Sequence, residues 1–98
     1  MAKFIVAFRL RDDSTYNSRY SGLIDAINDA GTVFWESGTS LIVMETSLGI
    51  TALGRRLKHS LDERTDILFL REIDVKNTAY SGAMGGGFDY FFPDAKKL

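Results

Sequence analysis

The stretch Phe4-Ile5-Val6-Ala7-Phe8-Arg9-Leu10, residues 4–10, decides the fold of this chain. Every second residue from Phe4 to Leu10 is large and apolar, while the residues between them become polar at Arg9. Such an alternation is typical of a β-strand, because successive side chains of a strand point to opposite faces of the sheet. We therefore expect the chain to begin with a strand whose apolar side packs on a core.

The next segment has the period of an α-helix. Apolar residues from Tyr20 to Ile27 stand at positions i, i+3, i+4 and i+7, which form one stripe of a helix. Asn17 and Ser18 are both suited to cap the start of this helix, and Gly31 follows its last turn as a stop signal.

The middle of the chain predicts a hairpin, a second helix and a further strand. Residues 32–36 and 40–46 are rich in β-branched and aromatic residues, and the short turn between them favours an antiparallel pair. A second helix is expected to begin after Ser47, and Gly54 within it indicates close packing on the sheet. Its predicted buried stripe consists of Ile50, Leu53, Leu57 and Leu61. Residues 67–73 predict the last strand.

The predicted order is strand, helix, strand, strand, helix, strand. Two such split βαβ halves form the ferredoxin-like fold of the α+β class, with a four-stranded antiparallel sheet and two helices on one face. We expect this domain to span residues 1–78. Residues 79–98 are expected to form a C-terminal extension, a glycine-rich link followed by an aromatic segment.

Both faces of the predicted sheet are apolar. The residues expected to face the helices are Val33, Trp35, Leu41, Val43, Ile67 and Phe69. The opposite face is expected to carry Ile5, Ala7, Phe34, Ile42, Met44, Leu68 and Leu70. One layer of helices cannot cover both faces, and a second copy of the same sheet is the simplest cover for the other one. The pattern therefore predicts a homodimer.

The C-terminal extension carries four aromatic residues within 88–92, after the glycine-rich run 81–87. No helical pattern and no Lys-Ser/Thr pair follows the glycines, which argues against a phosphate-binding loop. The aromatic residues are expected to dock either on their own subunit or on the partner subunit, and both alternatives stay open. The predicted dimer interface consists of Phe34, Ile42, Met44, Leu68, Leu70, Phe88, Tyr90, Phe91 and Phe92.

Composition excludes several classes of function. The 98 residues hold 12 Lys+Arg and 13 Asp+Glu, giving a formal net charge of −1, which disfavours binding of nucleic acid by bulk charge. The chain has no cysteine and one histidine, His59, which excludes disulfide scaffolds, thiolate chemistry and multi-histidine metal sites. No signal peptide or membrane-spanning stretch is found, so a cytoplasmic location and no membrane partner are expected.

Several segments taken together resemble a known family. They are the strand from Lys3 to Leu10, the stretch from Tyr20 to Ile27, Glu45-Thr46-Ser47-Leu48, Arg56-Leu57-Lys58, and the strand from Asp66 to Glu72. The chain is similar, over about residues 3–80, to the small ferredoxin-like relatives of the CRISPR-associated endoribonuclease Cas-two and the VapD toxins, often labelled SinR-like. The resemblance implies a homodimer packed sheet to sheet, with a C-terminal segment that often crosses over. It also implies a family common on phages and plasmids.

One position departs from the resembling family. Its nucleolytic members carry an aspartate near the end of the first strand, and the dimer brings two copies together around a divalent metal. The matching residue here is Arg9, a permanent cation that cannot ligate Mg²⁺. Asp12 and Asp13 are the nearby carboxylates that could act in its place, although loop aspartates before a helix are more often solvated or capping residues.

Two groups of basic residues are candidates for anion binding. Arg55, Arg56 and Lys58 lie on the second predicted helix beside His59, and a solvated helix face is the commoner explanation for such a run. A histidine near a helix C-terminus is also favoured by the helix dipole alone, so His59 is interpreted as structural. The other pair, Arg9 and Arg11, would occur twice near the axis of a dimer.

The preferred hypothesis is a non-catalytic homodimeric module that binds a protein or an anionic ligand. The first alternative is an RNA nuclease that uses Mg²⁺ or Mn²⁺ held by Asp12 or Asp13. The second is a small-nucleotide binder in which Arg9, Arg11 and the glycine run hold phosphate. No cofactor and no metal is expected outside the nuclease alternative.

Overall fold

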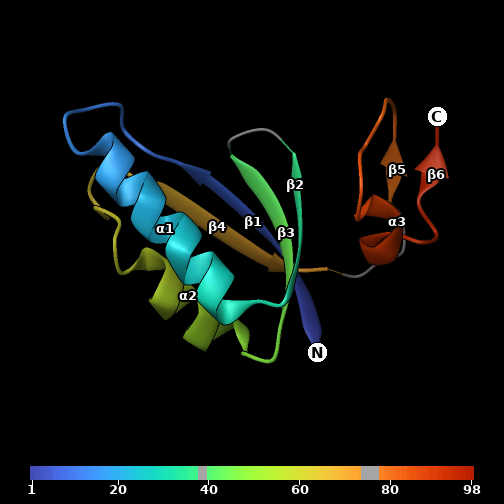
Figure 1. Ribbon diagram of the computed structural model, residues 1–98, viewed down its shortest axis with the longest axis horizontal. Coiled ribbons are helices and arrows are strands. Elements are labelled where there is room, and N and C mark those ends of the chain that lie inside the picture. Colours follow the sequence, from blue (N-terminus) through green and yellow to red (C-terminus); the bar gives the residue numbers. More distant parts are fainter. Residues whose placement is uncertain (38–39, 74–77) are drawn as a thin grey trace.

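The structure is a computed structural model that describes residues 1–37, 40–73 and 78–98, and of Val33–Ser37 the backbone alone. The main body contains β1 (Ala2–Arg9), α1 (Tyr16–Ala30), β2 (Val33–Ser37), β3 (Leu41–Thr46), α2 (Ile50–Lys58) and β4 (Ile67–Glu72), in the order that the sequence predicts (Figure 1).

The strands form one antiparallel sheet in the order β2-β3-β1-β4. The first strand of the chain therefore lies inside the sheet, between β3 and β4. Ile5 pairs with Val43 on one side, and Ala7 pairs with Phe69 on the other. The α+β class and the antiparallel pairing expected from the sequence are confirmed.

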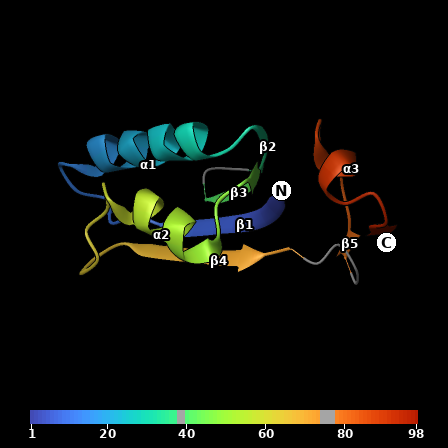
Figure 2. The same ribbon diagram turned by 90° about the horizontal axis from the view of Figure 1, so that it is seen from below.

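Both helices lie on the same side of the sheet, as Figure 2 shows. The main core fills the space between them and this helix-covered face, because the apolar stripe of each helix points at the strands. Its buried residues are Phe4, Val6, Phe8, Leu10, Leu23, Ile27, Ile42, Met44, Leu53 and Leu57. Burial of apolar side chains in a core of this kind is the main favourable contribution to the folding of a small domain.

The predicted faces of β3 and β4 are wrong. Ile42 and Met44 are buried under the helices, and Leu68 and Leu70 pack against the same core. The register explains the error. Met44 pairs with Phe4, and both Ile42 and Leu70 pair with Val6. Because directly paired residues share a face of the sheet, these side chains lie on the helix-covered face with Phe4 and Val6.

The face opposite the helices is called the outer face below. On the described residues of its strands it carries Lys3, Ile5, Ala7, Arg9, Leu41, Val43, Glu45, Ile67, Phe69 and Arg71, which are paired with one another. Ile42, Met44, Leu68 and Leu70 therefore do not belong to a dimer interface on this face. The side chains predicted for β2, those of Val33, Phe34 and Trp35, lie outside the described part of the chain.

The helix boundaries differ in detail from the expected caps. The residue before α1 is Thr15, and Asn17 and Ser18 lie exposed in the first turn. Gly31 does end α1, in an extended conformation, with its N–H donating to the carbonyl of Ile27. α2 begins at Ile50 after Gly49, rather than after Ser47, and Ile50 is 49% exposed, so it does not belong to the buried stripe.

Two glycines allow the helices to pack closely. A Cβ at Gly22 in α1 would stand 2.6 Å from the Cβ of Ser60, which follows α2, so the helices can approach here only without a side chain. A Cβ at Gly54 would stand 3.3 Å from Cδ1 of Leu70 on β4, which agrees with the expected close packing of α2 on the sheet.

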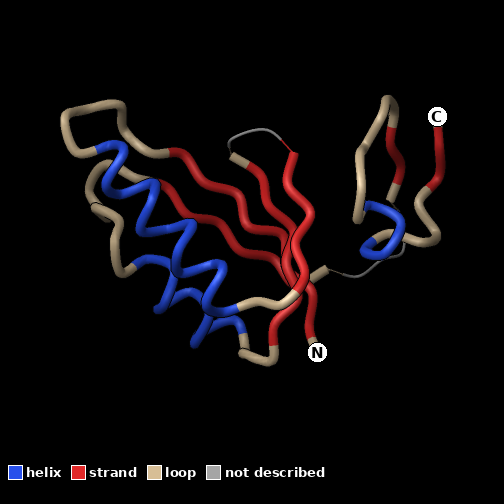
Figure 3. Tube along the Cα trace, viewed as in Figure 1, coloured by secondary structure: helices blue, strands red, loops and turns tan. Residues whose placement is uncertain are grey.

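The C-terminal segment forms a small unit of its own beside the sheet (Figures 1 and 3). It contains β5 (Ala79–Tyr80), the one-turn helix α3 (Phe88–Phe91) and β6 (Lys96–Lys97), and β5 pairs with β6 in parallel. The short helix was not expected from the sequence. It follows Gly87, whose φ of 88° is a conformation that glycine adopts most easily.

The C-terminal segment packs on the outer face of the sheet of its own chain. Phe88, Phe91 and Phe92 form a second buried cluster with Val43 of β3, and Ile5 of β1 packs against it. The sheet thus has a core on each face, one under the helices and one under the tail.

Candidate functional site

The end of β1 is where the resembling family implies a catalytic carboxylate. In this chain Arg9 is exposed on the outer face there, opposite Ile67 at the start of β4. Two carboxylates near this end, those of Asp13 and Asp66, belong to a polar cluster that joins the loop after β1 to the loop before β4.

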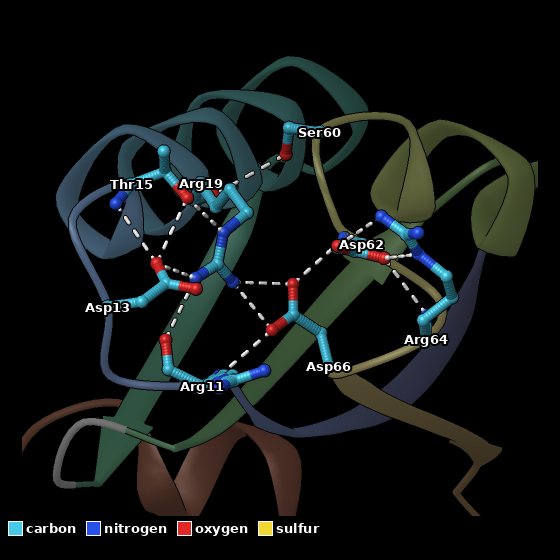
Figure 4. Close-up of polar contacts among 8 residues, drawn as sticks. All are labelled: Arg11, Asp13, Thr15, Arg19, Ser60, Asp62, Arg64 and Asp66. Carbon is cyan, nitrogen blue, oxygen red and sulfur yellow. Dashed lines mark hydrogen bonds and ion pairs between the residues drawn. The ribbon is translucent and has the colours of Figure 1, made fainter.

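This cluster, called the polar knot, consists of Asp13, Thr15, Arg19 and Asp66 with backbone groups of Arg11 and Asp62 (Figure 4). Nη1 of Arg19 donates to the two carboxylate oxygens of Asp66 at 2.5 and 2.6 Å. Its Nη2 donates to Asp13 at 2.7 Å and to the carbonyl of Arg11 at 2.8 Å, and its Nε donates to the hydroxyl of Thr15 at 3.0 Å. One guanidinium therefore fixes two loops and the first turn of α1.

Asp66 is the buried partner in the polar knot, with a side chain only 1% exposed. Besides Arg19, it accepts the backbone N–H groups of Arg11 at 3.0 Å and Asp62 at 2.9 Å. Burial opposes ionisation of Asp66, but these N–H groups and the guanidinium outweigh it and lower the pKa of the carboxyl. The charge of Asp66 is thus satisfied within the fold.

Asp13 and Asp12, the two loop carboxylates that the sequence offered as metal ligands, differ in their surroundings. Asp13 accepts hydrogen bonds from the side chain of Arg19 and from the N–H and hydroxyl of Thr15. The bond to Arg19, with those to Thr15, lowers the pKa of Asp13. Asp12 is exposed and forms no side-chain hydrogen bond or ion pair with the described residues.

A metal site needs several converging donors. Among the side chains that the structure describes, those of residues 1–32, 40–73 and 78–98, no three from Asp, Glu or His converge in this way. Within the same ranges, no helix is both long and apolar enough to cross a membrane.

The structure does not bring the predicted anion-binding residues together. Arg9 lies on the outer face, and the part of Arg11 that is engaged is its backbone. Arg55 and Arg56 lie on the far side of the sheet, in a groove between the helices. Lys58 is exposed at the end of α2 and does not line that groove.

Part of the outer face remains uncovered. We call it the open strip and define it as Ala7, Arg9, Leu41, Ile67 and Phe69, at the end of the sheet away from the tail. Ile67 is 51% exposed and Phe69 is 56% exposed. Two large apolar side chains next to each other on a strand are typical of a surface that another protein covers.

The other part of the outer face is closed by polar contacts as well as by aromatic packing. The hydroxyl of Tyr90 donates to the carboxylate of Glu45 at 3.1 Å, which raises the pKa of Tyr90. Nζ of Lys3 donates to the carbonyl of Tyr90 at 3.3 Å and lies 4.7 Å from the centre of its ring. Phe88, Phe91 and Phe92 are buried within the chain, so of the tail residues predicted for a dimer interface Tyr90 alone is exposed.

Sequence reasoning missed the polar knot. Asp13-Ser14-Thr15 before a helix is a recognisable turn signal, because an aspartate accepts the N–H two residues later. Arg19 and Asp66, however, are 47 residues apart and share no motif, so nothing in the sequence pairs them. Asp29, which lines the groove with Arg55 and Arg56, was missed for the same reason.

Comparisons with known proteins identify the fold. No protein-family model matches the chain. No curated protein matches it either. Among solved structures, the chain is similar to the crystal structure of Cas2 from Streptococcus pyogenes at pH 6.5, with a TM-score of 0.60 and 16% sequence identity. The match covers 76% of this chain and 88% of that chain. The fold is therefore Cas2-like, and at this identity the likeness concerns the fold alone.

Proposed function

We propose that the protein is a non-catalytic binding module that acts as a homodimer in the cytoplasm, a relative of the SinR-like and VapD-like proteins that binds a protein or an anionic ligand. The observation that carries this proposal is the state of the charges at the end of β1. A guanidinium, Arg9, is exposed there, and the carboxylates of Asp13 and Asp66 both form ion pairs with Arg19.

These charges oppose metal-dependent catalysis for a physical reason. A carboxylate that already accepts two or three hydrogen bonds loses them when it turns to a metal, and the exposed guanidinium repels the cation. Moving Asp66 would also leave Arg19, whose side chain is 11% exposed, without its closest partner. A metal would thus have to bind the same carboxylate oxygens that accept the hydrogen bonds of the polar knot.

The open strip supports the homodimer. A domain of this size buries only about 60–65% of its chain surface, so a second apolar interface adds a useful share of stability. A second copy of this chain carries the same strip, and a two-fold axis places a patch against itself. Ile67 and Phe69 would then fill the centre of the interface, and Arg9 would lie at its rim.

The oligomeric state tests this part of the proposal. Light scattering on the full chain at micromolar concentration is expected to give twice the mass of the 11.0 kDa chain. Phe69→Asp is expected to give a folded monomer that keeps its helix content and unfolds cooperatively, at a lower temperature than the dimer, because Phe69 is outside both cores and only the stabilisation by the second subunit is lost. Ile50→Asp is the matched control and is expected to stay dimeric, since Ile50 is 49% exposed but lies on α2, away from the open strip. A wild-type monomer, or a dimer that survives Phe69→Asp, would contradict the proposal.

Incubation with labelled RNA tests the absence of catalysis. With Mg²⁺ or Mn²⁺, and with a chelator in parallel, we expect no cleavage above that of a mock purification. Metal-dependent cleavage that Asp12→Asn abolishes would instead establish the nuclease alternative. Cleavage that persists unchanged in the double variant Asp12→Asn/Asp13→Asn would point to a contaminating enzyme.

A further inference from the structure

A groove of about 480 Å³ lies on the helix layer, on the other side of the sheet from the open strip. Ala26 and Asp29 line it from α1, Arg55 and Arg56 line it from α2, and His59 lines it directly after α2. The size is within the range of small-molecule sites in proteins, about 300–1,000 Å³.

The charged side chains of this groove have no polar partner among the side chains that the structure describes. Among the described residues, Asp29, Arg55, Arg56 and His59 form no side-chain hydrogen bond and no ion pair. Arg19 in the polar knot shows the opposite case, since all of its donors are used internally. Arginine and aspartate therefore bind each other in the polar knot, whereas in the groove the same residue types remain available to a ligand.

The set of groups indicates the chemistry of a ligand. Two guanidinium groups and an imidazole offer hydrogen-bond donors to an anion, and the planar guanidinium matches the geometry of phosphate. The carboxylate of Asp29 accepts hydrogen bonds and repels a second phosphate. A long polyanion such as nucleic acid would bring several phosphates past Asp29, and the net charge of −1 gives it no general attraction.

We propose that this groove binds a small ligand that carries one phosphate group and nearby hydroxyl groups, of the class of a ribonucleoside monophosphate. Arg55, Arg56 and His59 bind the phosphate, and Asp29 accepts hydrogen bonds from the hydroxyl groups. This inference goes beyond the proposed function and does not depend on it. A dimer joined through the outer face leaves the groove of each subunit open.

Calorimetric titration of the full chain with adenosine monophosphate, adenosine and inorganic phosphate tests the proposal. We expect the monophosphate to bind most tightly, because it alone occupies both parts of the groove. Arg55→Ala/Arg56→Ala is expected to weaken its binding at least about tenfold, since a hydrogen bond to a charged group is worth about 1.5–3 kcal/mol. These side chains are exposed, so the variant is expected to fold.

Two further variants separate the groove from general charge effects. Lys58→Ala removes one positive charge from the same helix outside the groove and is expected to leave binding unchanged. Asp29→Asn is expected to reduce the preference for the monophosphate over inorganic phosphate. Absence of monophosphate binding at millimolar concentration would overturn the proposal, as would an equal loss of affinity in Lys58→Ala. Either result leaves the test of the homodimer by light scattering unaffected.

Discussion

The two faces of the sheet are covered in different ways. The helix-covered face is closed by α1 and α2, which follow the strands closely along the chain, and ten of the residues whose side chains are described are buried in its core. The outer face is partly covered by α3 and its neighbours, which come from residues 78–98, and four described residues are buried in its cluster. The first core is a complete helix–sheet interior. The second covers only part of its face and leaves the open strip beside it.

This difference separates the residues that stabilise the fold from those that are exposed and can contact another molecule. A side chain on the helix-covered face is fixed by contacts from two layers. A side chain on the outer face is covered at one end of the sheet and exposed at the other, although the strands are the same. We therefore expect substitutions of similar chemistry to have different consequences on the two faces.

The largest expected effect is the loss of a side chain from the helix-covered core. Met44 is fully buried, and Met44→Ala is expected to lower the free energy of unfolding by about 2–5 kcal/mol, because it leaves a cavity. Measured in the monomeric Phe69→Asp background, where no dimer contact is lost, Ile67→Ala on the outer face is expected to change it by no more than about 0.5 kcal/mol. Urea unfolding followed by circular dichroism measures both. Equal losses in the two variants would mean that the assignment of faces is wrong.

Removal of the tail gives the next effect. A chain that ends at residue 78 is expected to keep its helix content and its cooperative unfolding, with a smaller loss of stability than Met44→Ala. Val43 and Ile5 lose their cover in this variant, so it is expected to bind a hydrophobic dye and to self-associate. Dye fluorescence and light scattering measure this. A truncated chain that is unfolded would show that the second cluster is needed for the fold itself.

Close packing of the helices gives an effect of intermediate size. Gly22→Ala is expected to cost about 1–3 kcal/mol, because the new Cβ would meet Ser60 at 2.6 Å. Gly49→Ala is the matched control, since nothing lies within 4 Å of a Cβ there. Thermal unfolding compares the two. If Gly22→Ala is tolerated as well as Gly49→Ala, the helices do not approach each other as described.

The smallest effect concerns pH and the polar knot. The pKa of Asp66 in the folded chain is below its ordinary value of 3.8, so the unfolded chain binds protons more readily. The contribution of Asp66 to stability is therefore complete above about pH 4 and is lost as the pH falls through the lowered pKa. Asp66→Asn is expected to reduce the stability at pH 7 and to flatten its decline between pH 5 and about pH 2. If the free energy of unfolding in urea declines with pH as steeply in Asp66→Asn as in the wild type, this role of Asp66 is excluded.

The sequence predicted the elements and their order because periodicity is local. The strand from Phe4 and the helix stripe from Tyr20 to Ile27 are visible in a few residues. The faces of β3 and β4 were not visible in the same way. Both sides of those strands are apolar, and the side that meets the helices is decided by the register against β1, which is a long-range property.

The candidate sites were less accessible to prediction than the fold. Arg55 and Arg56 were recognised as a basic run, but Asp29, which completes the groove, comes from another helix. The aromatic tail was recognised as a segment that must dock, since its composition alone requires burial. Its target, Val43 with Ile5, could not be read from sequence, because that contact depends on which face the helices leave free.

The contact between Lys3 and Tyr90 joins positions 87 residues apart, and it has a consequence for synthesis of the protein. A chain made from its N-terminus folds in that direction, with early elements assembling first. The aromatic residues that cover Ile5 and Val43 are made after every strand of the main sheet. Until these residues have docked, Ile5 and Val43 lack their cover. Any delay in docking of the aromatic tail would prolong the stage at which the chain is most prone to aggregate.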